Sequence, residues 1–237
     1  MVSKLCFIDW DDTLFCSTWL ASMKKVFGSD MNALRPSFES LENAICNLLD
    51  TVHKSGYKMY IVTNSETGWV ELSAKRHVPT VLDKLTEINV PIISARSQYE
   101  KLHGTSGLVD MESWKKEAIV NLLQPFCLAG NHTGQDTIYD VCGYISSDPT
   151  GFVFDQIHND SMIVKVNLLV IGDSPLDVQA AESAAVIPSV NVKIFKCKEN
   201  PDIFGIISQL NHISANFVSI ASNENFCIRI SEQHSPA

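Results

Sequence analysis

The chain has 237 residues, of which 45% are hydrophobic and 19% are charged. This composition is typical of a globular protein and excludes an extended disordered chain, while the length suits one domain or at most two small ones. Asp and Glu outnumber Lys and Arg by 27 to 18, so the net charge is −9. Because there is no basic run either, neither nucleic acid nor a membrane surface is expected as a partner.

The seven cysteines are scattered along the chain and form no CxxC pair. An odd number without a regular spacing predicts free thiols in a reducing compartment. No signal-peptide pattern opens the chain, and no apolar stretch approaches the ~18 residues that span a bilayer. We therefore expect a cytoplasmic protein.

Short apolar runs alternate with helical patterns along most of the chain. In chain order, the patterns predict a strand at 4–8, a helix at 37–55, a strand at 58–62, helices through Trp69 and at 81–88, a strand at 90–94, a helix at 112–123, a strand at 166–171, a helix from Pro175, a strand at 192–195 and a helix at 201–213. Pro91 limits the third strand to a strand start or an edge. Apolar strands separated by helices predict the α/β class, as a three-layer α/β/α sandwich around a doubly wound parallel sheet.

One stretch, 124–162, does not fit this alternation. It is rich in Gly, Asp, Asn and Thr, and a hairpin pairing 137–144 with 151–156 is one arrangement that its pattern allows. We expect a single domain over residues 1–237, with 124–162 as an insert.

Polar residues follow three of the predicted strands. They are Asp9-Trp10-Asp11-Asp12-Thr13, Thr63-Asn64-Ser65 and Gly172-Asp173-Ser174-Pro175-Leu176-Asp177. In open α/β sheets, ligands bind outside the carboxyl ends of the strands. Crowded carboxylates repel one another unless a cation or a shared proton relieves the repulsion. The pattern therefore predicts an oxygen-rich site that suits Mg²⁺, which binds to carboxylates, waters and a phosphate oxygen.

In these motifs the chain resembles the haloacid dehalogenase superfamily of phosphatases and phosphotransferases. The four motifs of the superfamily are met in order by DWDDT (Asp9, Asp11, Thr13), YIVT (Thr63), SWKKEAI (Lys115 or Lys116) and GDSPLD (Asp173, Ser174, Asp177). The resemblance covers most of the chain. The first and fourth motifs together make the resemblance specific, because each follows its own apolar run and they occur in this order.

The resemblance implies a doubly wound sandwich and a phosphatase that works through an aspartyl-phosphate. Asp9 would be the nucleophile, while Asp11 would protonate the leaving oxygen and then activate water. The implied metal ligands are Asp9, Asp173 and Asp11, the last through its backbone carbonyl, with Thr13, Ser174 and Asp177 in support. Thr63, Asn64 and Lys115 would bind the phosphoryl oxygens.

Several of these residues also have a purely structural interpretation. Asp177 is equally compatible with a helix N-cap, and Asp12 is better explained as a structural or capping acid. Trp10 is expected to pack against the fold. Either Lys115 or Lys116 could reach the site, and we favour Lys115 because it lies closer to the helix start.

Members of the superfamily differ mainly in cap insertions that close over the site. Too few residues separate Thr13 from the helix at 37–55 for a four-helix cap, and the predicted elements fill the second cap position. We therefore expect an open site with 14–35 as a flap, which favours a phosphoprotein or another bulky substrate. A small-metabolite phosphatase with 124–162 as a lid and a non-catalytic interaction protein on the same core are the alternatives.

Overall fold

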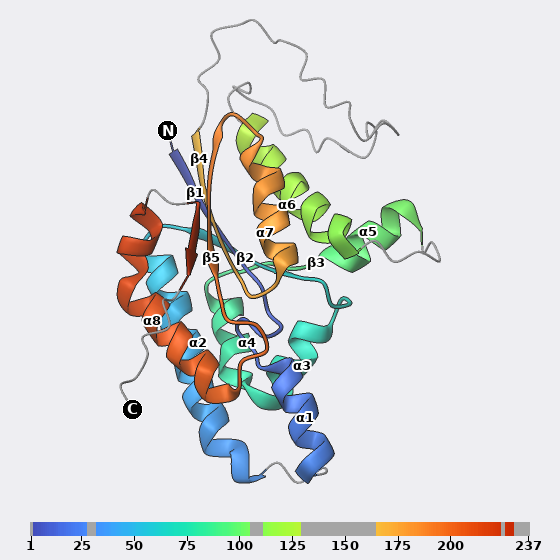
Figure 1. Ribbon diagram of the computed structural model, residues 1–237, viewed down its shortest axis with the longest axis vertical. Coiled ribbons are helices and arrows are strands. Elements are labelled where there is room, and N and C mark those ends of the chain that lie inside the picture. The colour runs from blue at the N-terminus through green and yellow to red at the C-terminus, as the bar shows by residue number, and fades with distance from the viewer. Residues whose placement is uncertain (1, 28–31, 105–110, 129–164, 224–225, 230–237) are drawn as a thin grey trace, which may run out of the picture.

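The computed structural model describes residues 2–27, 32–104, 111–128, 165–223 and 226–229. Strands and helices alternate along these residues (Figure 1). The strands are β1 (Val2–Ile8), β2 (Lys58–Thr63), β3 (Ile92–Ser94), β4 (Lys165–Gly172), β5 (Val190–Lys196) and β6 (Cys227–Arg229). The helices are α1 (Ser17–Phe27), a short 3₁₀ turn (Asn32–Leu34), α2 (Arg35–Lys54), α3 (Trp69–His77), α4 (Pro79–Glu87), α5 (Ala95–His103), α6 (Met111–Leu128), α7 (Pro175–Ala185) and α8 (Ile203–Ser222).

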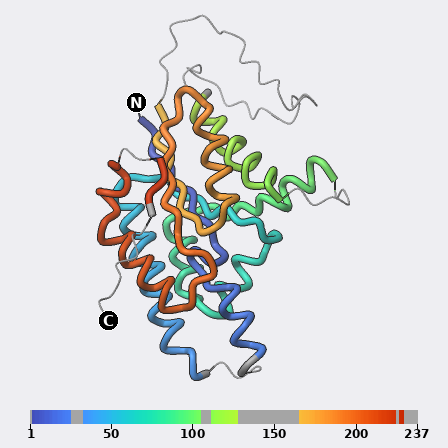
Figure 2. Tube along the Cα trace, viewed as in Figure 1, coloured from blue at the N-terminus to red at the C-terminus, as the bar shows by residue number. Residues whose placement is uncertain are grey.

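The strands form one six-stranded sheet in the order β3-β2-β1-β4-β5-β6, and every pair is parallel. The chain moves outward from β1 to β3 and then returns to place β4 on the other side of β1, where the two strands pair from Val2↔Lys165 to Ile8↔Ile171. Figure 2 shows this return, with the blue β1 beside the yellow-orange β4. The predicted α/β class and parallel sheet are confirmed.

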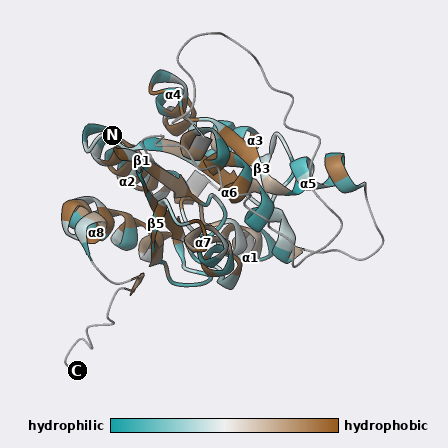
Figure 3. Cartoon of the chain, turned by 90° about the horizontal axis from the view of Figure 1, so that it is seen from above, coloured by the Kyte–Doolittle hydropathy of each residue, from teal (hydrophilic) through white to brown (hydrophobic). Residues whose placement is uncertain are grey.

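Helices cover both faces of the sheet. Successive strand residues point to opposite faces, so Cys6 and Ile8 pack with α2, α4 and α8, whereas Leu5 and Phe7 pack with α6 and α7. Seen from above, the apolar strands lie between α2 and α8 on one side and α6 and α7 on the other (Figure 3). Burial on both faces explains why the strands are continuously apolar rather than alternating.

The long helices follow the apolar stripes of the sequence. In α2, the stripe from Phe38 to Val52 is buried, and Pro36 lies at the helix start. Helix α8 starts at the cap Asp202, whose carboxylate accepts a hydrogen bond of 2.7 Å from the backbone N–H of Gly205. It ends at Ser222 and not at the predicted residue 213, because buried apolar positions such as Phe217 continue the stripe against the core.

Besides the 3₁₀ turn at Asn32–Leu34, three elements of the structure were not predicted from the sequence. Helix α1 occupies part of 14–35, where only a flap was expected, and α5 and β6 were not expected at all. Helix α5 buries only Ala95, and β6 has three residues, so neither carries a periodic apolar signal. The strand at 90–94 is shorter than predicted, Ile92–Ser94, and lies at the sheet edge, as Pro91 indicated.

The predicted hairpin and residues 129–162 of the insert lie outside the described residues, while residues 124–128 form the end of α6. The six described cysteines are free, as expected, and Cys142 lies outside the described part of the chain. None of the described helices combines the length and the apolar character that crossing a bilayer requires.

Candidate active site

The candidate site lies at the carboxyl ends of β1, β2 and β4. The strand order reverses direction between β1 and β4, which is the place where open α/β sheets bind ligands. The backbone N–H of Asp9 donates to the carbonyl of Ile171 at 2.9 Å, so the end of β1 is tied to the end of β4. Asp9 and Asp173, which are far apart in the sequence, therefore leave the sheet side by side.

Three buried carboxylates, those of Asp9, Asp173 and Asp177, form what we call the acid cluster. One oxygen from each lies within 4.8 Å of the others, an arrangement that could hold a metal ion. Lys115 is the cation of this cluster, since its Nζ lies 2.9 Å from Asp9 Oδ1 and 2.6 Å from Asp177 Oδ1. Only 3% of the Lys115 side chain is exposed, so the two ion pairs are shielded from water.

Asp177 is held by the start of α7 as well as by Lys115. Its Oδ2 accepts a hydrogen bond from the backbone N–H of Ser174 at 3.0 Å, and its own backbone N–H donates to the Ser174 hydroxyl oxygen at 3.3 Å, which together form a capping box. The Ser174 hydroxyl also donates to Oδ2 at 2.7 Å. Gly172 makes room for this carboxylate, because a Cβ at residue 172 would lie 2.3 Å from Asp177 Cγ. The N-cap of α7 is therefore Ser174 and not Asp177, which supports the cap from the first turn through Oδ2, while its Oδ1 pairs with Lys115.

Two further hydrogen bonds orient the other acids. The Thr13 hydroxyl donates to Asp173 Oδ1 at 3.1 Å, and the backbone N–H of Trp10 donates to Asp9 Oδ1 at 2.8 Å. The first bond links the loop after β1 to the loop after β4. Together the two bonds fix the directions in which Asp9 and Asp173 face the space between them.

The acid cluster carries an excess of negative charge, which shifts the pKa values of its members. Burial raises the pKa of Asp9 well above its usual value; Lys115 opposes this effect, while Asp177 and Asp173 add to it. Burial and then Asp177 raise the pKa of Asp173 to about 6, against the Thr13 hydrogen bond and Lys115. Burial disfavours the charge of Lys115, but Asp177 and Asp9 outweigh it and raise the pKa of the ammonium. One cation does not balance three carboxylates, and a divalent ion would.

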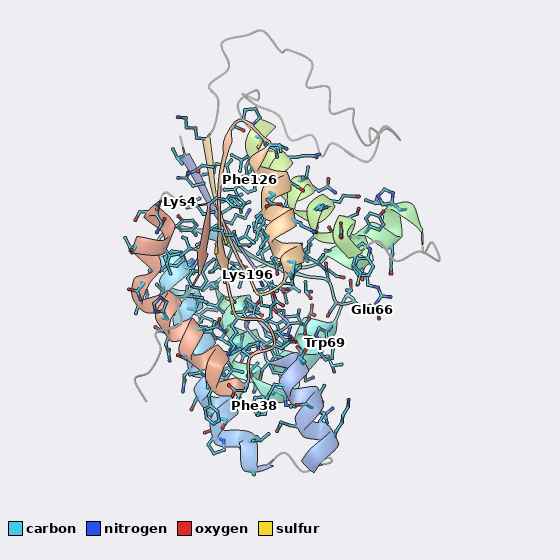
Figure 4. The ribbon with its side chains drawn as sticks, viewed as in Figure 1. Lys4, Phe38, Glu66, Trp69, Phe126 and Lys196 are labelled. Atoms are coloured by element: carbon cyan, nitrogen blue, oxygen red, sulfur yellow. The ribbon has the colours of Figure 1, made fainter. Side chains whose placement is uncertain are left out.

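Asp11 lies in different surroundings, which we call the Asp11 network. Its Oδ1 accepts hydrogen bonds from the Ser17 hydroxyl and from Trp69 Nε1, the latter at 2.8 Å. Its Oδ2 accepts hydrogen bonds from the Thr63 hydroxyl at 3.2 Å and from the Ser65 hydroxyl at 2.7 Å. All four donors are neutral. Figure 4 labels Trp69 at the start of α3, where that helix approaches α1.

The structure thus brings together most of the predicted site residues, in two groups. The acid cluster with its immediate partners contains Asp9, Thr13, Lys115, Asp173, Ser174 and Asp177. The Asp11 network contains Asp11 and Thr63, so the Asp11 carboxylate does not join the acid cluster. Asn64 follows Thr63, and its buried Oδ1 has no hydrogen-bond partner among the described residues. Lys116 is half-exposed and pairs with Glu112 at 3.7 Å, outside both groups.

The structural interpretations of two neighbouring residues are confirmed. Asp12 caps α1 by accepting hydrogen bonds from the backbone N–H of Thr18, at 3.0 Å, and from its hydroxyl. Trp10 is fully buried, stacks on Phe15 and donates from Nε1 to the hydroxyl of Ser73 at 2.9 Å.

Three residues of the Asp11 network had no functional role in the sequence analysis. Ser65 had a weak signal, since it continues the polar cluster after β2. Ser17 and Trp69 had none, because each begins a helix that meets Asp11 only in the folded chain.

A cavity of about 370 Å³ lies between α1 and the segment that joins β5 to α8. It is lined by Thr18, Trp19, Ser22, Lys198, Asn200, Pro201, Asp202 and Gly205. None of the site residues lines this cavity.

We compared the chain with protein-family models, with curated proteins and with solved structures, and no match was found in any of the three.

Proposed function

We propose that the protein is a Mg²⁺-dependent phosphatase of the haloacid dehalogenase type, which hydrolyses a phosphomonoester through an aspartyl-phosphate on Asp9. The observation that best supports this proposal is the acid cluster with Lys115, beside which the Thr63 hydroxyl and Asp11 lie at the same sheet edge. Carboxylates, a lysine and a hydroxyl are what phosphoryl transfer needs, because its catalysis is mostly positioning and charge stabilisation.

The donor set of the acid cluster fits magnesium. Its side-chain ligands are all oxygens, and the cluster contains neither His nor Cys, the ligands that zinc favours. Asp9 and Asp173 would hold the ion together with the backbone carbonyl of Asp11. Asp177 stays in support, because Lys115 and Ser174 already occupy both of its oxygens. When bound, Mg²⁺ neutralises charge on the phosphoryl oxygens.

The residues of the chain divide the reaction between them. A carboxylate oxygen of Asp9 attacks phosphorus, and the bond from phosphorus to the leaving oxygen breaks as Asp11 gives that oxygen a proton. Water then attacks the phosphorus of the aspartyl-phosphate and gives a proton to Asp11. The bond between phosphorus and the Asp9 oxygen breaks, so phosphate is released and the Asp9 carboxylate is restored. Thr63 and Lys115 would stabilise the charge that spreads over the phosphoryl oxygens, with the amide of Asn64 beside them.

We further propose a phosphoprotein, or another bulky phosphorylated partner, as the substrate. Among the described residues, α1 and the 3₁₀ turn are the only elements between β1 and α2, so a partner's own surface would exclude water from the site. The net charge of −9 favours a partner with basic residues near its phosphate and disfavours nucleic acid. A small metabolite, with 124–162 as a lid, is the alternative, and the cytoplasm is the proposed location.

Hydrolysis of 4-nitrophenyl phosphate tests the chemistry. We expect turnover with Mg²⁺, its loss in excess EDTA, and a loss of about 10³-fold or more in Asp9→Asn, since the amide lacks the carboxylate oxygen that attacks phosphorus. Full activity in EDTA, activity with Zn²⁺ alone, or an active Asp9→Asn variant would contradict the proposal. No turnover with any metal would favour the interaction protein.

The substrate class is tested separately by comparing kcat/KM for phosphopeptides with kcat/KM for small phosphates. If one small metabolite reaches about 10⁵ M⁻¹s⁻¹ and phosphopeptides are ignored, the bulky substrate is wrong and the phosphatase chemistry stands.

A further inference from the structure

The two oxygens of the Asp11 carboxylate have partners of different kinds. Oδ2 is bound by Thr63 and Ser65, which belong to the segment at the end of β2. Oδ1 is bound by Ser17 and Trp69, which begin α1 and α3. This division separates the oxygen near the proposed phosphate ligands from the oxygen that is held by the helices.

Only one of the two oxygens loses a partner when a phosphoryl group binds. A hydroxyl has one hydrogen to donate, so Thr63 cannot donate to Asp11 and to a phosphoryl oxygen at the same time. Thr63 is the proposed phosphate ligand, and if its hydroxyl turned to the substrate, Oδ2 would lose one of its two donors and keep Ser65. Ser17 and Trp69 have no such competing partner in the proposed reaction and would keep their bonds to Oδ1.

Trp69 is itself held firmly in place. Its ring packs against the core, and its backbone N–H donates to the carbonyl of Glu66 at 3.1 Å. The hydroxyl of Ser73 donates to the carbonyl of Trp69 at 2.8 Å and accepts the indole N–H of Trp10 at 2.9 Å. Because Trp10 lies between Asp9 and Asp11 in the chain, these bonds close a ring from the first motif to Trp69 and back to Asp11.

We infer that Trp69 and Ser17 are positioning residues for Asp11: they anchor Oδ1, so that Oδ2 is the oxygen that exchanges the proton with the leaving group. This inference rests on the proposed phosphatase function. The proton on Oδ2 passes to the leaving oxygen as the phosphorus–oxygen bond breaks, and Oδ2 takes a proton back from the water that attacks the aspartyl-phosphate. Neither Trp69 nor Ser17 contacts the reacting atoms.

Trp69→Phe tests the inference, because it removes the indole N–H and keeps an aromatic ring in the core. The measurement is kcat/KM for two esters, 4-nitrophenyl phosphate with a good leaving group and phenyl phosphate with a poor one. A hydrogen bond to a charged group is worth about 10- to 100-fold, so we expect a loss of this size for phenyl phosphate. For 4-nitrophenyl phosphate, which needs little protonation, the expected loss is less than about threefold.

Trp19→Phe is the matched control, since it makes the same change on α1 in a residue that lines the cavity beside that helix. Any change in kcat/KM that Trp19→Phe causes should be the same for the two esters. Thermal unfolding followed by circular dichroism shows whether each variant is folded. If Trp69→Phe does not fold, Ser17→Ala removes the other donor to Oδ1 and should give the same selective loss for phenyl phosphate.

Two results would overturn the inference while the phosphatase function stands. The first is an equal loss of kcat/KM for both esters in the folded variant, which indicates a packing role alone. The second is no loss of kcat/KM for either ester. A wild-type protein that hydrolyses neither ester with Mg²⁺ overturns the proposed function and this inference together, so the wild-type measurement distinguishes the two failures.

Discussion

Asp9 and Asp11 stand two residues apart, yet the fold places them in opposite kinds of surroundings. Asp9 lies in the acid cluster, 7% exposed, with a buried lysine as its partner. Asp11 is half-buried and is held by an indole and three hydroxyls, all of them neutral. In the proposed reaction, Asp9 stays with the metal ion and Asp11 exchanges the proton.

The two surroundings also differ in how much the removal of a single side chain should cost. In the acid cluster, the removal of its cation, Lys115, leaves its carboxylate partners buried without compensation, which costs several kcal/mol. In the Asp11 network, each donor contributes one hydrogen bond, so its removal weakens the position of the carboxylate by a smaller step. Four predictions test this contrast.

Asp11→Asn should lower kcat/KM for phenyl phosphate by about 10²- to 10⁴-fold, because an amide cannot transfer the proton. The breakdown of the aspartyl-phosphate should slow as well, so that phosphate accumulates on the protein. Mass spectrometry of the digested protein should find this phosphate on Asp9. Phosphate on Asp173 would show that the roles are assigned to the wrong carboxylates.

Lys115→Met should lower the free energy of unfolding by about 3–5 kcal/mol in EDTA, since Asp9 and Asp177 lose their buried partner. Urea unfolding measures the change. Lys116→Met is the matched control on the same helix, where the exposed pair with Glu112 contributes less than about 1 kcal/mol. Equal effects of the two variants would contradict the special position of Lys115.

Gly172→Ala should lower the free energy of unfolding by about 1–3 kcal/mol and weaken Mg²⁺ binding, because its Cβ would overlap the Asp177 carboxylate at 2.3 Å. Gly56→Ala serves as the comparison. Residue 56 has a φ of 77° with no atom within 4 Å of an added Cβ, so the variant brings backbone strain without a contact at the site. Calorimetric Mg²⁺ titration should separate the two variants, and an unchanged affinity in Gly172→Ala would contradict the close fit.

Magnesium binding should weaken as the pH falls through about 6, the raised pKa of Asp173. Below that pH the carboxyl holds a proton that competes with the ion, and the affinity should fall by roughly tenfold per pH unit. Without metal the sign is reversed: a carboxyl whose pKa is raised on folding stabilises the folded protein as the pH falls toward the unfolded-state value. Thermal shifts with and without Mg²⁺ at pH 7.5 and pH 5 measure both effects. A Mg²⁺-induced shift that is equal at the two pH values would argue against Asp173 as a ligand.

The sequence by itself determined the elements whose signal is local. Continuous apolar runs identified β1, β2 and β4, because a strand buried on both faces has no polar side. The apolar stripe of α2 and the acids that follow the strands could also be predicted, because their patterns are local in the sequence. Together these features predicted the parallel sheet and the edge of the sheet at which the candidate site lies.

Only the tertiary structure decided which side chains meet at that edge. The bond from Lys115 to Asp177 joins residues 62 positions apart, and the bond from Trp69 to Asp11 joins residues 58 positions apart. Such contacts depend on strand order and on the direction in which each helix approaches the sheet, and no local pattern encodes either. For this reason the sequence left Lys115 and Lys116 as alternatives and left open whether Asp177 is a helix cap or a site residue. It had no signal for Trp69.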